Sequence, residues 1–455
     1  MKKLSFIVVI SLTFLETRAQ QISKAQAIAD IDYYNQVLSE VHYNPYLYIS
    51  KDAYLDFTDK LKSSLPDSVS LKSFVLLMNR LTAEIKDGHT SPSIVQQAFK
   101  EDFQKKIYFP FELTTDEKLD IYLPIQPTTS EIPAGAKIIS VNGVRLKNFF
   151  LDLLGRVDKN QSFRLEMTCG LLGNYLYLAN VKPPFDIKYE YRGQTENKTI
   201  PYGITLKESL SKALPQVANN KYSFEIKDGK VGHLILNTME SDLNRYTTFF
   251  DSCFNLVKTK KLKAVAIDLR KNLGGNSQIA DLLISYFNTN PYSLSAGRYW
   301  RVSQRYKDYL TAQGDTSNTY LKEANGTVID RRNCGAHTPL FINNSLLFSG
   351  KVYLITGPLT FSSANMLADG VKQYKMAIII GEPTGENTND FGEVLRIALP
   401  NSKLSIQTTT TFDLGVDCND QKSQTVKPDI LIKTTLKAKI EKTDPVMEYL
   451  LKNIN

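Results

Sequence analysis

Cysteine is scarce in this sequence, and the spacing of the few cysteines argues against the commonest structural metal site. The chain has four cysteines among 455 residues, Cys169, Cys253, Cys334 and Cys418. They lie far apart and form no C-x-x-C pair, which disfavours zinc. An exported protein can hold one or two disulfides, but the spacing here does not assign a pairing.

Long apolar runs are also missing beyond the start of the chain. Residues 4–15 are apolar, but this run is shorter than the ~20 residues needed to span a bilayer. The run follows Lys2 and Lys3 and precedes Thr17-Arg18-Ala19, so we predict that residues 1–19 are a secretory signal peptide. No cysteine follows it to carry a lipid anchor, and no later segment is long and apolar enough to cross a membrane. We therefore expect an exported protein, periplasmic or extracellular.

Runs of charge of one sign are absent as well. The formal net charge is +8, and it falls to +6 without residues 1–19, which carry three basic residues and one acidic residue. This surplus is scattered and forms no basic stripe, so nucleic acid is disfavoured as a partner. With 42% hydrophobic and 22% charged residues, the composition is that of a folded globular protein.

Three textures follow one another along the chain and predict a multidomain α/β protein. Apolar residues at helical spacing predict an N-terminal helical domain over residues 20–100. Short alternating strands with Gly, Pro and Asn-Gly turns predict a β-rich domain over residues 101–205. Strands and helices alternate over residues 206–455, which predicts an α/β domain. A polar insertion rich in Tyr and Arg interrupts it at about residues 290–345, either as a lid or binding loop or as a helical surface excursion.

The β-rich region contains one recognisable signature. The stretch "PAGAKIISVNGVRLKNFFLDL" resembles a PDZ domain, in which a helix borders a groove that binds an extended peptide by strand addition. The alternative is a small β domain that acts only as a spacer.

Two strand–loop–helix units in the last domain could carry chemistry. In "AVAIDLRKNLGGNSQIADLL", Gly274 and Gly275 follow a buried strand and precede a helix, so backbone N–H groups can approach a ligand closely. Neither G-x-x-x-x-G-K-S/T nor G-x-G-x-x-G is present, which disfavours a phosphate site. An oxyanion hole fits this loop better.

The second unit, "VYLITGPLTFSSANMLADGV", places Ser362 and Ser363 where a loop ends and a helix begins. One interpretation is that both serines are N-caps, because Ser is favoured there. The other is that one is a nucleophile, with the next amide pointing at the oxyanion that forms after attack. A nucleophilic serine needs a base.

The histidines offer four candidates for that base: His42, His89, His233 and His337. His233 lies in an apolar strand and is expected to be a bystander, and His42 and His337 lie near turns, where structural or surface roles are typical. His89 follows a helix end on a Gly-punctuated turn, from which an imidazole can project into a cleft or face solvent.

Four ordered motifs complete the picture. "LTAEIKDGHTS", "IDLRKNLGG", "LITGPLTFSSANMLADGV" and "IIIGEPTG", with a PDZ-like segment between the first and the second, resemble the tail-specific (C-terminal processing) serine peptidase family. The closer likeness is to its branch of tricorn-core and retinoid-binding-protein relatives, and it covers most of residues 30–435. The resemblance implies a ClpP/crotonase-like α/β catalytic domain after the PDZ-like domain.

The resemblance also implies roles for residues. Ser362 matches the nucleophile, Gly274 and Gly275 match the loop that gives one oxyanion donor, and the amide of Ser363 matches the other. The lysine base of the Ser-Lys members is missing from "EPTGENTNDFGE", whereas His89 matches the histidine base of the tricorn-like branch.

Three positions depart from the family pattern. Asn365 stands in place of the usual Glu, and Gly88 in place of the serine that orients the histidine. The orienting Glu near the C-terminus is also absent, and Asp420, Asp417 and Asp87 are the candidates to replace it. Loss of such an orienting group can lower a rate by orders of magnitude.

From this we expect an exported serine endopeptidase that cleaves unfolded or C-terminal peptide segments without metal or organic cofactor. Two alternatives stay open. The first is a binding protein of the same fold that has lost catalysis and holds a peptide or an apolar ligand. The second is a hydrolase of another acyl bond, such as an ester or a lactam.

Overall fold

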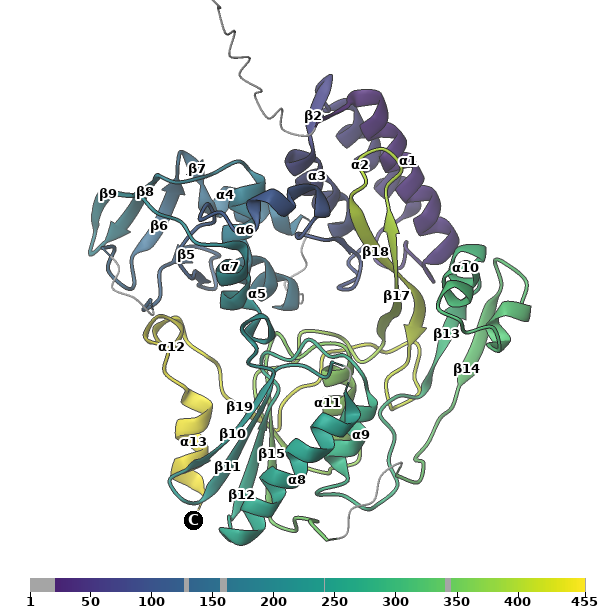
Figure 1. Cartoon of the computed structure of the whole chain (residues 1–455). Helices are drawn as coiled ribbons and strands as arrows, with labels where there is room; N and C mark the ends of the chain where they lie inside the picture. Colours follow the sequence, from purple (N-terminus) through teal and green to yellow (C-terminus); the bar gives the residue numbers. More distant parts are fainter. Residues whose placement is uncertain (1–20, 127–130, 156–161, 241, 340–344, 455) are drawn as a thin grey trace, which may run out of the picture.

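The computed structural model describes residues 21–126, 131–155, 162–240, 242–339 and 345–454 (Figure 1). The predicted signal peptide, residues 1–19, lies outside these ranges. Within them, the chain is a mixed α/β protein whose helices accompany several separate sheets. No helix in the described ranges is long and apolar enough to cross a membrane.

Helices predicted near the N-terminus are present. They are α1 (Lys24–Val41), α2 (Lys51–Ser63) and α3 (Leu71–Ala83). Each starts after a serine whose side chain accepts a hydrogen bond from the first turn, which explains where the helices begin. The short strands β1 (Gln21–Ser23) and β2 (Ser68–Ser70) pair antiparallel beside them.

The middle of the chain forms an antiparallel sheet with helices packed on it. Its strands are β4 (Thr114–Thr115), β5 (Ile121–Tyr122), β6 (Lys137–Val141), β7 (Val144–Arg145), β8 (Phe185–Tyr191) and β9 (Gln194–Ile200). The helical segments around it are η1 (Gln97–Asp102), α4 (Leu146–Leu154), α5 (Ser162–Gly170), α6 (Leu172–Leu178), α7 (Leu206–Ala213) and η2 (Pro215–Ala218). This region and the N-terminal helices share one hydrophobic core, so they pack as a continuous unit.

A second, largely parallel sheet organises the last half of the chain. Its order is β10 (Tyr222–Lys227), β11 (Val231–Leu236), β12 (Ala264–Asp268), β15 (Lys351–Thr356), β16 (Ile378–Gly381) and β19 (Ile430–Leu431). Only β10 runs antiparallel to its neighbour. The covering helices are α8 (Leu243–Thr259), α9 (Gln278–Ile284), α11 (Ser363–Gln373) and α13 (Pro445–Asn453), whereas α12 (Leu436–Glu441) lies beside β4 of the middle sheet.

The parallel register brings two loops to one edge of this sheet. Residues of α8, α9 and α11 share a core with one face, and α13 packs on the other face (Figure 1). All residues of β12 are buried, as the apolar sequence predicts for a central strand. The loops after the neighbouring strands β12 and β15 leave the sheet at the same edge, and each leads into a helix. Ligand sites of α/β proteins lie at such an edge.

A third sheet connects the two halves and explains the predicted insertion. It contains β14 (Val328–Arg332), β13 (Gly297–Arg301), β18 (Ser405–Asp413), β17 (Asp390–Ala398) and the short β3 (Ser91–Pro92). The insertion supplies β13, α10 (Gln304–Ala312), η3 (Thr319–Lys322) and β14, and its Trp300 and Tyr306 pack against α1. Its described residues are therefore a strand–helix–strand excursion docked away from the cavity discussed below, and none of them lines that cavity.

The cysteines divide into two groups. Cys334 of the insertion and Cys418, which follows β18, form a disulfide across 84 residues of chain. Cys169 and Cys253 are buried and free. The sequence left this pairing open, because it depends on how the insertion folds back onto β18.

Candidate active site

Segments from all parts of the chain meet at the edge of the parallel sheet. The loop after β12 brings Gly274 and Gly275, the loop before α11 brings Ser362, and the pairing of β3 with β18 fixes the segment that carries His89. The structure thus brings together residues that are up to 273 positions apart (from 89 to 362).

Ser362 has an unusual backbone at the start of α11. Its φ is 55° and its ψ is −128°, a combination that costs a non-glycine residue about 1–3 kcal/mol. Its side chain makes no capping hydrogen bond, and the Oγ of Ser363 donates instead to the carbonyl of Gly275 at 2.6 Å. Ser362 thus occupies the N-cap position of α11, but neither serine caps the helix with its side chain, as the N-cap interpretation predicts. Strain at a serine that caps nothing is typical of a functional position.

The Gly274–Gly275 loop presses directly on this serine. A Cβ at Gly274 would lie 2.7 Å from the Cβ of Ser362 and 2.8 Å from the amide nitrogen of Ser363. A Cβ at Gly275 would lie 2.4 Å from the backbone of Met239, and both glycines have positive φ. Only glycine fits at these positions.

The two loop amides are used differently. The amide of Gly274 donates to Oδ1 of Asn272 at 2.8 Å. Within the described ranges, the amides of Gly275 and Ser363 donate no hydrogen bond. The arrangement therefore leaves two backbone donors next to Ser362 that can bind an oxyanion.

His89 lies at the wall of a large cavity of about 1310 Å³. Its ring is mostly buried and packs on Phe361, with 4.5 Å between ring centroids, and its carbonyl accepts a hydrogen bond from Gln407 at 2.8 Å. Burial lowers the pKa of His89, and the negative charge of Asp87 opposes this shift. The imidazole is therefore neutral at neutral pH, which is the form that can accept a proton.

Asp87 holds the segment that carries His89 in place through hydrogen bonds. Its carboxylate accepts hydrogen bonds from the His89 amide at 2.7 Å, the Thr90 hydroxyl at 2.6 Å and the Thr409 hydroxyl at 2.9 Å. His42 is buried beside it, with 3.3 Å from Nε2 to the Asp87 carboxylate. Nδ1 of His42 accepts from the amide of Asn44, so Nε2 carries the proton and donates to Asp87.

These donors keep Asp87 ionised. Although burial acts in the opposite direction, the hydrogen bonds from His42 and Thr90, and the charges that His42 and His89 carry when protonated, lower the pKa of Asp87 to about 2. Its nearer oxygen lies 3.8 Å from Nδ1 of His89, so Asp87 contacts His89 through the backbone amide rather than through the ring.

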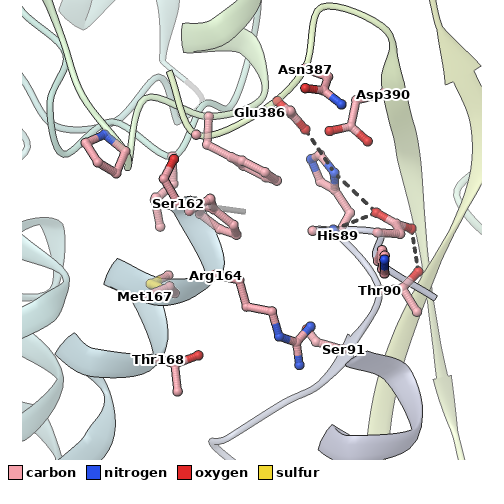
Figure 2. A pocket seen from close by; sticks show the side chains of 18 of the residues that line it. His89, Thr90, Ser91, Ser162, Arg164, Met167, Thr168, Glu386, Asn387 and Asp390 are labelled. Atoms are coloured by element: carbon pink, nitrogen blue, oxygen red, sulfur yellow. Dashed lines mark hydrogen bonds and ion pairs between the residues drawn. The ribbon is translucent and has the colours of Figure 1, made fainter. Parts of the chain in front are cut away.

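Glu386 is a site residue that the sequence analysis missed. Its Oε1 lies 3.5 Å from Nδ1 of His89, and both atoms are buried without a hydrogen-bond partner in the described part of the chain (Figure 2). Its other oxygen accepts a hydrogen bond from the amide of Ser362. Glu386 thus lies between the candidate base and the candidate nucleophile.

The protonation of Glu386 differs from that of Asp87. Burial and the neighbouring Asp390 raise the pKa of Glu386 well above its ordinary range. Burial, followed by the charge of Asp87, raises the pKa of Asp390 to about 7. Burial and Asp390 therefore favour the protonated form of Glu386. Glu386 lies in the motif "GEPTGEN", but its burial depends on chain segments far away in sequence. The motif alone therefore does not identify it as a site residue.

Two of the proposed orienting residues lie elsewhere. Asp420 accepts a hydrogen bond from the hydroxyl of Tyr299 at 2.7 Å, and Asp417 is exposed and accepts from the amide of Asn419 at 3.2 Å. Of the three candidates, Asp87 alone contacts the segment of His89. His233 is buried on β11, and its ring lies between Glu225 of β10 and Asp268 of β12, as expected for a bystander.

Gly88 stands where the resemblance implies an orienting serine, and packing explains it. A Cβ at Gly88 would lie 2.7 Å from the ring of Phe361. The Phe361 ring stacks in turn on Phe163, with centroids 3.9 Å apart. Space that a serine would need is filled by this aromatic pair.

Two further observations complete the chemistry of the site. No hydrogen bond joins the side chains of His89 and Ser362, and Phe361 and Glu386 are the residues that contact both. Among the residues that the structure describes, no three His, Cys, Asp or Glu side chains are grouped as metal ligands.

Comparison with known proteins gives one family match and several similar structures. Residues 230–432 match the model of peptidase family S41. Mature CPAF is 16% identical, with 94% of this chain and 96% of that chain covered and a TM-score of 0.64. Mature CPAF complexed with lactacystin is also 16% identical, with 94% and 97% covered and a TM-score of 0.65. The photosystem II D1 C-terminal processing protease is 13% identical, with 90% and 93% covered and a TM-score of 0.45. No curated protein matches the chain.

Proposed function

Because the chain contains a peptidase family S41 domain and is a serine-type peptidase by that membership, we propose that it hydrolyses peptide bonds with Ser362 as nucleophile and His89 as base. The observation that carries this proposal is the strained Ser362, with two amides beside it that donate no hydrogen bond in the described ranges, and a buried histidine whose ring packs on the preceding Phe361.

The reaction follows from these positions. The Ser362 hydroxyl attacks the carbonyl carbon of the substrate, and Nε2 of His89 takes its proton. The amides of Gly275 and Ser363 hold the oxyanion. His89 then gives the proton to the leaving amine, and water hydrolyses the acyl-enzyme with His89 again as base.

Glu386 fixes the ring of His89 in this scheme. If Nδ1 carries the proton and points to Oε1 of Glu386, Nε2 is free to act as the base. The 3.5 Å contact between Nδ1 and Oε1 can shorten into a hydrogen bond. Catalytic hydrogen bonds often shorten only when substrate binds.

The finer parts of the assignment belong to the same proposal. The sheet of residues 114–200 would be the PDZ-like domain that presents an extended peptide, and the parallel sheet would be the ClpP/crotonase-like catalytic domain. The substrates would be unfolded or C-terminal segments of exported proteins, met in the periplasm or outside the cell.

Labelling with a fluorophosphonate tests the proposal. We expect the wild type to be labelled, and Ser362→Ala and His89→Ala to lose the label. Ser211→Ala and His337→Ala remove the same groups outside the site and should keep it. A folded wild type that takes no label would contradict the proposal.

A second candidate is a binding protein of the same fold. It is favoured by the missing hydrogen bond between His89 and Ser362, and by Asn365, whose amide donates to the carbonyl of Asn387 at 2.8 Å where the resemblance implies a Glu. Peptide binding that Ser362→Ala leaves unchanged, without turnover of denatured casein, would support it. Cleavage of activated esters but of no peptide would instead indicate a hydrolase of another acyl bond.

A further inference from the structure

Arg164 is a cation of the cavity that forms no ion pair in the described ranges. It lies in the first turn of α5, and its side chain reaches into the cavity toward Ser91 of β3 (Figure 2). Its Nε is buried and has no hydrogen-bond partner among the described residues. The guanidinium makes a single long hydrogen bond, from Nη2 to the carbonyl of Leu153 at 3.4 Å.

Two other partly buried arginines of this protein are paired with carboxylates. Arg270 is held by Asp268 and Asp444, with shortest contacts of 2.5 and 2.7 Å, and Arg305 is held by Glu40 at 2.7 Å. Within the described ranges, Arg164 has no such ion pair. An unpaired guanidinium with a buried Nε is unfavourable unless a bound group completes it, because the desolvated donors remain unsatisfied.

The surroundings of Arg164 suit an anion. The cavity is also lined by Lys86, Arg396 and Lys427, and none of these forms an ion pair in the described part of the chain. Asp87, Glu382, Glu386 and Asp390 also line the cavity, but Asp87 is satisfied by its own donors, and burial raises the pKa of both Glu386 and Asp390. The hydroxyl-bearing residues Ser91, of β3, and Thr168, of α5, also line the cavity (Figure 2).

Arg164 is also connected to the reacting centre. The adjacent Phe163 stacks on Phe361, which directly precedes Ser362. Arg164 and His89 line the same cavity, so a group bound by Arg164 lies in the cavity of His89. The contact of Phe163 with Phe361 connects Arg164 to Ser362.

We propose that Arg164 binds a carboxylate of the peptide substrate and so determines which peptides are cleaved. A carboxylate can accept two parallel hydrogen bonds from a guanidinium, which lysine cannot reproduce. The carboxylate can be the free C-terminus of the peptide or an Asp or Glu side chain. This inference rests on the proposed function, because it assigns a specificity to that site.

Matched peptides test the proposal. One series carries a free C-terminal acid or a C-terminal amide, and a second series, all amides, carries Glu or Gln at successive positions. We expect kcat/KM of the wild type to favour one acidic series by about 10- to 100-fold, the size of a charge-assisted hydrogen bond. Preference for the free acid identifies the C-terminus as the source, and preference for Glu identifies a side chain.

Variants assign that preference to Arg164. Arg164→Gln should lower kcat/KM for the acidic peptides to the level of the neutral ones and leave the neutral ones unchanged, which also shows that it is folded. Arg164→Lys should recover only part of the preference. Arg192→Gln removes an exposed arginine that does not line the cavity and should keep the preference. A wild type without preference, or a preference that survives Arg164→Gln, would overturn the proposal.

Binding separates this proposal from the proposed function. If no peptide is cleaved, fluorescence anisotropy with the same labelled peptides and Ser362→Ala still measures the preference. Tighter binding of acidic peptides that is lost on adding Arg164→Gln supports the carboxylate site without catalysis. Equal binding of acidic and neutral peptides contradicts the site whether or not the chain is a peptidase.

Discussion

Two buried carboxyl groups flank His89, and the protein treats them in opposite ways. Asp87 receives hydrogen bonds from an amide, two hydroxyls and the His42 imidazole, and its pKa falls to about 2. Glu386 receives one amide hydrogen bond, faces Asp390, and its pKa rises well above the ordinary range. Equal burial thus gives an anion on one side of the histidine and a neutral acid on the other.

The difference teaches that the number of donors, and not burial, decides the charge of each group. A buried carboxylate that accepts several hydrogen bonds stays ionised, and one that faces a second carboxyl group takes up a proton. Asp87 is therefore a structural anchor that joins α1, β3 and β18. Glu386 lies next to the reacting centre, and its Oε1 has no hydrogen-bond partner in the described part of the chain. The hydrogen bonding of Glu386 can therefore change, whereas that of Asp87 is complete.

Asp87→Asn should have the largest effect on stability. The Asn side chain would place an N–H group among donors that need an acceptor, so we expect the free energy of unfolding to fall by about 3 kcal/mol, as for other broken buried ionic contacts. Urea unfolding measures this. Asp417→Asn changes an exposed aspartate and should stay within about 0.5 kcal/mol of the wild type. A small effect of Asp87→Asn would mean that the donors do not stabilise an anion there.

Asp87 and Asp390 should make the free energy of unfolding depend on pH in opposite senses. The pKa of Asp87 is lower in the folded state, so its contribution is present above its ordinary pKa of 3.8 and is lost as the pH falls toward 2. The pKa of Asp390, the partner of Glu386, is raised from 3.8 to about 7, so its stabilising proton is lost as the pH rises across that window.

Asp390→Asn separates these contributions. It should flatten the decline in the free energy of unfolding between pH 4 and 7, and leave the acid limb below pH 4 unchanged. Urea unfolding at several pH values measures both limbs for the wild type and the variant. If the free energy of unfolding of the wild type instead rises from pH 4 to 7, and this rise is absent in Asp390→Asn, the explanation is wrong.

Much of this site could be predicted from the sequence, and the limits have physical causes. Ser362, His89 and the Gly274–Gly275 loop carry local signals, because a strand, a tight turn and a helix start are short-range patterns. The family resemblance agrees with the match to peptidase family S41 over residues 230–432. The mixed α/β multidomain fold was also predictable.

The network around His89 could not be predicted, because it depends on long-range contacts. Thr409 and Asp87 are 322 positions apart, and they meet only because β18 pairs with β3. Asp420 is a second example. The C-terminal motif suggested it as an orienting residue, but its carboxylate accepts a hydrogen bond from Tyr299 of the insertion. Glu386 went unnoticed because nothing in "GEPTGEN" indicates that its carboxyl group is buried against Asp390.

Glu386→Gln should have the smallest effect, and this result would sharpen the contrast with Asp87. If Glu386 is neutral at pH 7, the Gln side chain reproduces its shape, and its oxygen can still accept from the Ser362 amide or from Nδ1 of His89. We expect kcat/KM at pH 7 to change by less than about tenfold, which is 1.4 kcal/mol. Glu386→Leu removes both acceptors at similar volume and should lower kcat/KM by about 10- to 100-fold, because it leaves buried N–H groups unpaired. If Gln were as damaging as Leu, the charge of Glu386 would be what His89 requires, and the two carboxyl groups would be alike after all.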